Sequence, residues 1–360
     1  MMEKRAFWCF MSATDVTQNN SDIADSPLKP QGAAKKMDRR FCTAPMMEWS
    51  DRHCRYFWRH LSKHAVLYTE MVTTGAIIHG QGGPERFLDY NSIEHPIALQ
   101  LGGSKPGELA QCTRIAESFG YDEVNLNVGC PSDRVQNNMI GACLMGHPNL
   151  VADCIKAMQD AASIPVTIKH RIGIDDQDSY EQLAAFVDTV AATGCTTFIV
   201  HARKAILQGL SPKENREIPP LKYDVVYKLK QDFPDLEIII NGGINSLEAS
   251  HQHLQHVDGV MVGREAYHNP GLLLGVDEQI YGQKASNADR KAIIRDLYPY
   301  IDNVVGRGGK LNYVTRHLLG LFNGQPGARK FRRYLSENAY TQSAGTSELE
   351  TALSFIPDNI

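Results

Sequence analysis

Short apolar segments alternate with amphipathic stretches from about residue 41 to residue 280. The apolar segments predict buried parallel strands at 41–46, 66–72, 97–101, 123–128, 166–170, 197–201, 237–240 and 259–262. Apolar residues three and four positions apart predict helices at 51–62, 106–118, 150–162, 179–192, 221–231, 246–255 and 270–280. Ser50 is the expected N-cap of the first helix, and Pro106 lies in the first turn of the second. Eight strands in about 225 residues favour a TIM (β/α)8 barrel over a doubly wound sheet, which needs fewer strands.

The pattern becomes entirely helical after residue 285. Apolar spacing predicts helices over 290–305, 313–321 and 328–338, separated by glycine-rich breaks. Residues before 39 have neither a helical nor a strand period and are rich in Asn, Ser, Asp, Thr and Gln, which indicates a disordered tail. A true start of the protein at Met11 would also explain their composition. We therefore expect an α/β protein with four parts: a tail (1–38), a barrel (39–284), a small all-α domain (285–345), and a tail or short helix (346–360).

The composition is that of an ordinary globular protein, with 42% hydrophobic and 22% charged residues among 360. Eight cysteines without a CxxC pair suggest a reduced intracellular set, and no apolar run approaches the length of a membrane helix. We therefore expect a cytoplasmic protein that has no membrane partner. The net charge of −4 hides an asymmetry, because residues 285–340 contain ten Lys and Arg against four Asp and Glu. The rest of the chain has 27 basic and 37 acidic residues, so an anionic partner such as nucleic acid would meet the helical part.

Barrels of this kind place their active site at the C-terminal ends of the strands, and polar residues gather at those positions here. The seventh and eighth predicted strands end in Asn241, Gly242 and Gly243 and in Gly263 and Arg264. Glycine allows backbone N–H groups to approach a phosphate, and arginine adds charge-assisted hydrogen bonds. These ends predict a phosphate site; two ordinary tight turns are the alternative.

Lys169 and His201 end the fifth and sixth predicted strands. A lysine directed into a barrel mouth needs an anionic partner, which a flavin ring gaining negative charge on reduction would supply. The alternatives are a structural ion pair of Lys169, for example with Glu70, and a core histidine at position 201. Gln100, near the end of the third strand, could bind the polar edge of a flat heterocycle, although glutamines at strand ends are also common on surfaces.

Cys130 follows the fourth predicted strand and opens a loop that extends through Gly141 to Gly146. Glycines suit a mobile lid, and an ordinary thiol, with a pKa of about 8.5, is mostly protonated at neutral pH. Cys130 is therefore the candidate proton donor and Cys143 its rival. The sequence HQHLQH (251–256) does not predict a metal site, since its first two histidines project to different sides of a helix.

Residues from about 39 to 340 resemble the tRNA-dihydrouridine synthases, and specifically their A subfamily. The resemblance is carried by NVGCPSDRVQNNMIGACLM (127–145), TEMVTTGAIIHG (69–80), HARKAILQGLSPKENREIPPL (201–221) and DGVMVGREAYHNP (258–270). It implies a TIM barrel that binds FMN, followed by a helical tRNA-binding domain. One departure is His170, where the family pattern leads us to expect a smaller residue.

The resemblance also implies residue roles. Cys130 takes the general-acid position, Asn127 helps to hold the target base near the flavin, and Arg171 lines the same pocket. The flavin would contact Pro45, Met46, Met47, Gln100, Lys169 and His201, and its phosphate would lie on Asn241, Gly242, Gly243, Gly263 and Arg264. Residues expected to hold tRNA phosphates include Lys213, Arg216, Arg329 and Arg332.

The implied reaction reduces uridines near position 20 of the tRNA D-loop to 5,6-dihydrouridine, with NADPH as reductant. We expect a monomer that needs no metal. The nearest alternative is an FMN barrel that acts on a free pyrimidine, which would not need a basic helical appendage. An alternative from another class is a non-catalytic RNA-binding protein, which would not contain flavin.

Overall fold

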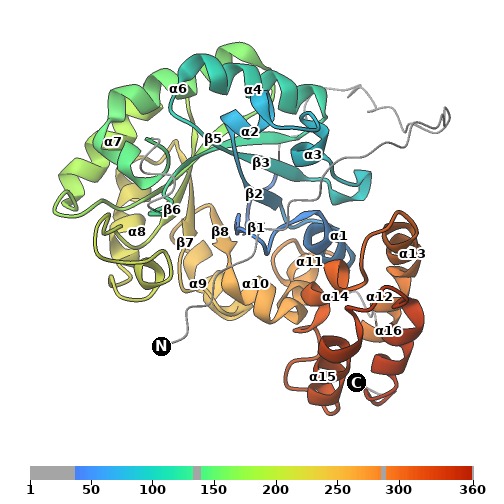
Figure 1. Cartoon of the computed structure of the whole chain (residues 1–360). Helices are drawn as coiled ribbons and strands as arrows, with labels where there is room; N and C mark the ends of the chain where they lie inside the picture. The colour runs from blue at the N-terminus through green and yellow to red at the C-terminus, as the bar shows by residue number, and fades with distance from the viewer. Residues whose placement is uncertain (1–36, 133–138, 285–288, 359–360) are drawn as a thin grey trace, which may run out of the picture.

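A computed structural model describes residues 37–132, 139–284 and 289–358. Eight parallel strands form one sheet in the order β1-β8-β7-β6-β5-β4-β3-β2. The amide of Thr43 donates to the carbonyl of Val66 at 2.9 Å, which joins the first strand to the segment before the second and closes the barrel. The predicted TIM barrel is confirmed (Figure 1). Its strands are β1 (Phe41–Thr43), β2 (Leu67–Thr73), β3 (Ile97–Gly102), β4 (Glu123–Val128), β5 (Val166–Arg171), β6 (Thr197–His201), β7 (Glu237–Asn241) and β8 (Gly259–Val262).

Helices surround this sheet and cover its outer face (Figure 1). Their apolar sides form the large outer core with the outward side chains of the strands. They are α1 (Arg52–Leu61), α2 (Thr74–His79), α3 (Glu85–Leu88), α4 (Pro106–Ser118), α6 (Pro148–Ala161), α7 (Tyr180–Ala191), α8 (Tyr223–Asp232), α9 (Leu247–Leu254), α10 (Arg264–His268) and α11 (Val276–Gln279). Short 3-10 turns are η1 (Ser92–Glu94), η2 (Ala142–Gly146), η3 (Glu214–Arg216) and η4 (Pro270–Gly275).

The barrel interior has an apolar side and a polar side. The apolar side is a separate buried cluster of Met37, Cys42, Ala44, Val66, Tyr68, Ala98, Ile199, Ile239 and Met261. Met37 belongs to this cluster, so ordered packing begins before the expected end of the tail at residue 38. Residues 1–36 of that predicted tail lie outside the described residues. The polar side, on β4 and β5, contains Glu123, Asn125 and Thr167.

The C-terminal part is helical, as expected, and lies beside the barrel near α1 and α10 (Figure 1). The predicted helix over 290–305 is two helices, because Pro299 in the first turn of the second cannot continue the hydrogen bonding of the first. The last segment forms the short helix rather than a tail, and it packs against its predecessor. The helices are α12 (Arg290–Asp296), α13 (Tyr298–Gly306), α14 (Asn312–Leu318), α15 (Ala328–Asn338) and α16 (Thr346–Leu353).

Asp51 joins the barrel to this helical part. Its side chain accepts from the amide of Cys54 at 2.9 Å and so caps α1, which corrects the expectation that Ser50 is the cap. His317 and Arg316 of α14 both bond to the same carboxylate, His317 at 3.0 Å. Burial alone would raise the pKa of Asp51, but the hydrogen bond and charge of His317 bring it well below its usual range. The junction is therefore a charged contact in which His317 is buried and Arg316 is exposed.

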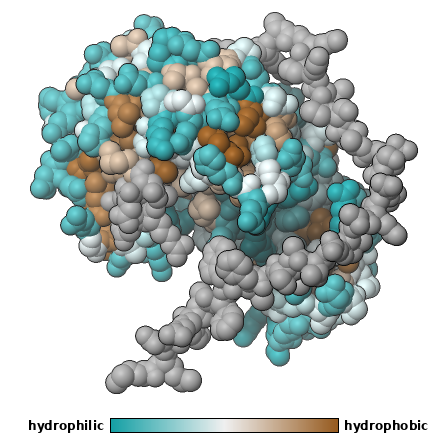
Figure 2. Space-filling model, turned by 45° about the horizontal axis from the view of Figure 1, so that its top comes forward, coloured by the Kyte–Doolittle hydropathy of each residue, from teal (hydrophilic) through white to brown (hydrophobic). Residues whose placement is uncertain are grey.

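The face of the molecule in Figure 2 is mainly hydrophilic, with hydrophobic residues in separate areas. In the described part of the chain, no helix is both long and apolar enough to cross a membrane. In the described ranges, the large apolar side chains that remain exposed are Met47, Ile93, Met139, Ile218, Tyr313 and Tyr340. Met47 is 59% exposed and lies just beyond the end of β1, on the side where the candidate site is expected.

Candidate active site

The C-terminal ends of β5 and β7 meet across the barrel mouth. The ammonium of Lys169 on β5 donates to Oδ1 of Asn241 on β7 at 3.1 Å. The amide nitrogen of Asn241 donates in turn to the carbonyl of Met261 on β8 at 2.7 Å. The side-chain amide of Asn241 is therefore oriented by β8, with its oxygen facing the lysine. The structure thus joins two of the sequence-predicted residues directly.

Lys169 has an unusual environment for a cation. Burial, with the added charge of Arg171, lowers its pKa to about 7, and the nearby Cys130 offsets part of this decrease. Within the described residues it forms no ion pair with a carboxylate. Glu70, the partner considered from the sequence, instead accepts from the backbone amide of Glu48. The expected ion pair with Glu70 is therefore absent, and no other described carboxylate pairs with Lys169, which suits an anion in the mouth.

His201 lies between these two strands, at the end of β6. Burial, followed by the charges of Arg171 and Lys169, holds its pKa well below the usual value, so the imidazole is neutral at pH 7. Arg203 and Arg216 lower this pKa further. The side of the mouth formed by β5, β6 and the loop after β6 is therefore strongly cationic, which suits a ligand with negative charge.

The glycines at the end of β7 have the geometry expected of a close backbone approach. Gly242 and Gly243 have φ of +119° and +72°, and a Cβ on Gly242 would lie 2.7 Å from the His201 ring. Tyr223 donates its hydroxyl to the carbonyl of Gly242 at 2.8 Å. Arg264, after β8, bonds to Glu217 at 3.1 Å, so it would have to share its guanidinium between this carboxylate and a phosphate.

The end of β1 forms the opposite wall. Pro45 and Met46 are half-buried and Met47 is exposed. Ser50 is tied to Met46 in both directions: its hydroxyl oxygen accepts from the Met46 amide at 2.9 Å and its hydroxyl donates to the Met46 carbonyl at 3.2 Å. This turn ends β1 at Thr43, earlier than the expected 46, and it places Met46 close to Gly263.

Cys130 is held by backbone bonds on both sides. Its amide donates to Oδ1 of Asn127 at 2.9 Å, and its carbonyl accepts from the amide of Ala142 at 2.8 Å. The thiol of the rival Cys143 points to the carbonyl of Ile140 at 3.5 Å, and burial raises its pKa. The middle of the predicted lid, 133–138, lies outside the described residues.

Arg171 connects the Cys130 loop with the loop after β6. Its Nε donates to the carbonyl of Gly129 at 2.8 Å, and its Nη1 donates to the carbonyls of Lys204 and Asn215 at 3.0 and 3.1 Å. The sequence predicted that Arg171 lines the pocket. The structure gives it three backbone partners, so it also holds together the two loops that carry Cys130 and Arg216.

His170 lies on the other face of β5. It is fully buried, its ring contacts Phe186 and Phe198 of the outer core, and its Nδ1 donates to the carbonyl of Arg171 at 2.7 Å. Burial lowers its pKa to about 4. Because strand residues alternate between faces, this larger residue packs against α7 and leaves the mouth unchanged.

We predict that Gly141→Ala destabilises the protein by about 1–3 kcal/mol, because it places a side chain in a left-handed conformation. Gly141 has φ of +85°, and a Cβ there would lie 2.4 Å from the carbonyl oxygen of Cys130. Urea unfolding measures the change. The control is Gly107→Ala, whose Cβ would meet nothing within 4 Å at the start of α4. Equal stability of the two variants would contradict the prediction.

A model of the dihydrouridine synthase (Dus) family matches residues 42–356. The chain belongs to the dihydrouridine synthase family. It is 63% identical over 337 residues to the tRNA-dihydrouridine(20/20a) synthase of Escherichia coli K12, covering 93% of this chain and 97% of that protein. It is 59% identical to the synthase of the same name from Pseudomonas aeruginosa, covering 91% and 98%. The chain is therefore an oxidoreductase of this family.

Among solved structures, the old yellow enzyme homologue from Zymomonas mobilis aligns with a TM-score of 0.48 and 12% identity, covering 69% of this chain and 90% of that chain.

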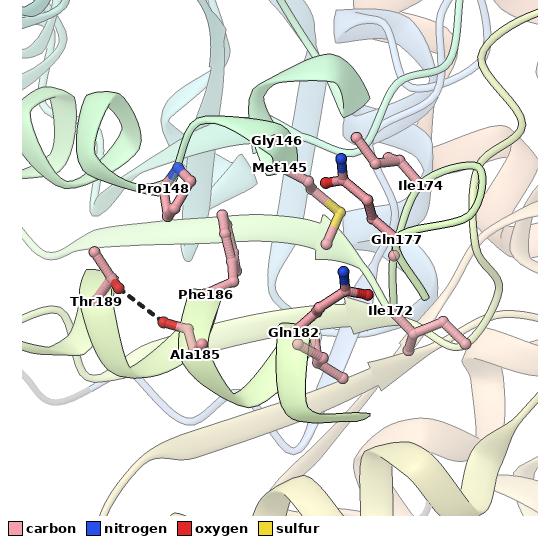
Figure 3. A pocket seen from close by; sticks show the side chains of 12 residues that line it. Met145, Gly146, Pro148, Ile172, Ile174, Gln177, Gln182, Ala185, Phe186 and Thr189 are labelled. Carbon is pink, nitrogen blue, oxygen red and sulfur yellow. Dashed lines mark hydrogen bonds between the residues drawn. The ribbon is translucent and has the colours of Figure 1, made fainter. Parts of the chain in front are cut away.

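A separate cavity of about 230 Å³ lies outside the barrel, beside β5 (Figure 3). Figure 3 shows the side chains of Met145, Ile174 and Phe186 of α7 among those that line it. None of the residues predicted for flavin or base contact in this Dus family member lines it. The mouth described above, rather than this cavity, is therefore the candidate active site.

The remaining predicted residues are on the surface. Lys213 precedes η3 and Arg216 is its last residue, in the loop after β6, where burial and the charge of Arg264 lower the pKa of Arg216. Arg329 is exposed on α15, and Arg332 on the same helix donates to Asn323 at 2.7 Å. The first pair borders the mouth, while the second pair belongs to the helical part.

Three residues of the polar interior were not predicted from the sequence. Glu123, Asn125 and Thr167 lie below the mouth and are at most 1% exposed. The sequence Glu-Val-Asn-Leu-Asn-Val of β4 was a signal for them. Polar and apolar residues alternate in it, although both faces of the strand are buried. Strands of parallel sheets normally form continuous apolar runs, so polar residues on the inner face of β4 require a partner or a function.

Proposed function

We propose that this member of the family reduces uridines near positions 20 and 20a of the tRNA D-loop to 5,6-dihydrouridine, with FMN as cofactor and NADPH as reductant. The observation that carries the proposal is the barrel mouth, where Cys130, Asn127 and Lys169 converge at the ends of β4 and β5. The identity with full-length relatives named tRNA-dihydrouridine(20/20a) synthase supports the substrate.

The residues of the mouth fit a flavin mononucleotide. Lys169 is a partly buried cation that has an amide oxygen but no carboxylate beside it among the described residues, so it suits an anionic part of the ligand. Gly242 and Gly243 leave room for a phosphate near the end of β7, where barrels of this class commonly bind one. Met46 and Met47 would lie against the ring. When bound, a flavin would supply the redox chemistry of the site, which is hydride transfer from NADPH and, from N5, to C6 of the uridine.

The protein itself supplies the proton. The thiol of Cys130 donates a proton to C5 of the uridine as C6 receives the hydride, which completes the reduction of the C5–C6 double bond. Asn127 and Arg171 hold the backbone on either side of Gly129, and so they orient this thiol. The base must leave the folded tRNA to reach the mouth, at a cost of a few kcal/mol. Contacts to tRNA phosphates offset that cost.

The function is tested by assaying the purified protein. We expect a flavin absorbance spectrum, NADPH oxidation that depends on unmodified tRNA, and dihydrouridine mapped to positions 20 and 20a. NADPH oxidation with free uracil instead of tRNA would favour the pyrimidine reductase. Purified protein that has no flavin and takes up none would favour the non-catalytic RNA-binding protein.

We predict that Arg329→Ala combined with Arg332→Ala weakens tRNA binding and lowers its salt dependence. Each phosphate contact contributes about one unit to the slope of log K against log salt, so the slope should fall by about 1–2. Filter binding over a range of salt concentrations measures both. The matched control is Lys156→Ala combined with Lys228→Ala, which removes the same charge from ion pairs on α6 and α8. Equal slopes for the two double variants would contradict a role of α15 in binding.

A further inference from the structure

Five buried side chains form a continuous hydrogen-bonded series from the interior of the barrel to the Cys130 loop. They come from three adjacent strands, β3, β4 and β5, and we call them the amide relay: Glu123, Thr167, Asn125, Gln100 and Asn127. Four are at most 1% exposed, and Asn127 at the mouth is 8% exposed. Polar groups buried to this extent in a barrel core are costly unless every bond is made.

The bonds of the amide relay are short and consecutive. The hydroxyl of Thr167 donates to Glu123 at 2.6 Å and accepts from Nδ2 of Asn125 at 2.9 Å. Oδ1 of Asn125 accepts from Nε2 of Gln100 at 2.8 Å. Oε1 of Gln100 accepts from Nδ2 of Asn127 at 2.8 Å. Oδ1 of Asn127 then accepts the backbone amides of Gly129 and Cys130, at 3.1 and 2.9 Å.

The two ends of the series determine its direction. At the inner end, the oxygens of Glu123 accept from Arg39, Tyr68 and Thr167, so the single hydroxyl hydrogen of Thr167 is used there. Thr167 can then only accept from Asn125, which sets the orientation of that amide. Each following amide is oriented by the one before it. At the outer end, two N–H donors require an acceptor, and the direction set by Glu123 presents the oxygen of Asn127 to them.

We propose that Thr167, Asn125 and Glu123 are positioning residues that act through Gln100 and Asn127 to hold the backbone of Cys130 in place. None of the three needs to touch cofactor or substrate for this role. If the hydroxyl of Thr167 is lost, Asn125 has no fixed orientation and can turn its nitrogen toward Gln100. The reversal would pass along the relay until the nitrogen of Asn127 faced the two amides of the loop. The catalytic meaning of this inference rests on the proposed function, but the structural coupling does not.

The test compares two substitutions, each of which removes a hydroxyl group that donates a hydrogen bond to Oε1 of Glu123. Thr167→Val removes the bond at 2.6 Å and also the acceptor for Asn125, whereas Tyr68→Phe removes a bond at 2.6 Å outside the amide relay. Thr167→Ser retains the hydroxyl and is the conservative control. Hydrogen exchange of the peptide containing Gly129 and Cys130, together with alkylation of Cys130 by iodoacetamide followed by peptide mapping, gives two readouts that need neither tRNA nor turnover.

We expect exchange at Gly129 and Cys130 to be about tenfold faster in Thr167→Val, which corresponds to the loss of one hydrogen bond. The rate of Cys130 alkylation should also change in Thr167→Val. In Thr167→Ser and Tyr68→Phe, both the exchange rates and the alkylation rate should remain close to those of the wild type. If Thr167→Val does not fold, Thr167→Cys offers a weaker acceptor in its place and the same comparison. Wild-type exchange in Thr167→Val, or equal loosening in Tyr68→Phe, would overturn the proposal.

Turnover separates this inference from the proposed function. With unmodified tRNA, Thr167→Val should reduce kcat by about tenfold or more, because small displacements of a reacting group are costly, and Thr167→Ser should restore it. If Cys130 is not the acid, exchange still changes in Thr167→Val while kcat does not. If the relay does not position the loop, exchange is unchanged whatever the activity of Cys130 variants.

Discussion

Replacement of Cys130 by alanine is expected to leave the flavin bound and to lower dihydrouridine formation by about 100-fold or more, the usual contribution of a general acid. Among the described residues, the bonds that hold this residue come from its backbone amide and carbonyl, not from its thiol. Alanine therefore keeps the loop in place and removes only the proton donor. Single-turnover reduction of unmodified tRNA by prereduced protein measures the effect without the NADPH step.

Cys143→Ala is the matched control for this variant. Cys143 is in the same loop region and is half-buried, but its thiol bonds to the Ile140 carbonyl rather than facing the mouth cations. The Cys143→Ala variant should therefore retain activity close to that of the wild type. Unchanged single-turnover rates in Cys130→Ala, or equal losses in the two variants, would show that Cys130 is not the proton donor.

The order of elements was predictable because strand and helix periods are local. The segments 123–128, 197–201 and 259–262 coincide with β4, β6 and β8, and α15 has the predicted bounds. The predicted bounds were wrong where tertiary contacts override the local period of apolar residues. The predicted strand 41–46 is cut short by the turn between Met46 and Ser50, and most of the predicted helix 270–280 is a 3-10 turn. Neither contact can be read from the apolar pattern alone.

The charge of the helical part illustrates a second limit. The surplus over 285–340 leaves out the acids of the last segment, which form ion pairs with α12 in the structure. Glu350 of α16 pairs with Arg295 at 2.6 Å, and Asp358 pairs with Lys291 at 2.6 Å. Arg316 is likewise used by Asp51 of the barrel. These pairs engage three of the ten basic residues, which lowers the free positive charge of the helical part, while Arg329 stays exposed on α15.

The candidate site was predictable at the strand ends, where the fold class itself indicates the active face. Lys169, Asn241 and His201 could be named because each lies at the C-terminal end of a predicted strand. The amide relay was not predicted, since its bonds join residues 25 to 44 positions apart, such as Gln100 to Asn125 and Thr167 to Glu123. A sequence shows polar residues on an inner strand face but not the direction of their hydrogen bonds.

Lys169 links the binding of an anionic flavin to pH. In the free protein its pKa is about 7, compared with an ordinary value of 10.5, because burial disfavours the cation. Between these two values the unfolded chain binds more protons at this site than the folded protein, so the stability of the free protein should rise with pH through that window. An anion bound beside Lys169 reverses the effect of burial and raises the pKa, so binding takes up a proton above pH 7.

We therefore predict that FMN binds the apoprotein progressively more weakly as the pH rises above about 7, by up to tenfold per pH unit. Lys169→Met should weaken binding by about 100-fold at pH 7, the order expected when one partner of a desolvated charge pair is removed, and should abolish the pH dependence. Fluorescence titration of FMN from pH 6 to 9 measures both effects. Lys156→Met, on the surface of α6, is the control for loss of a positive charge. A pH slope that persists in Lys169→Met would assign the proton to another group, because His170 and His201 are already neutral throughout this range.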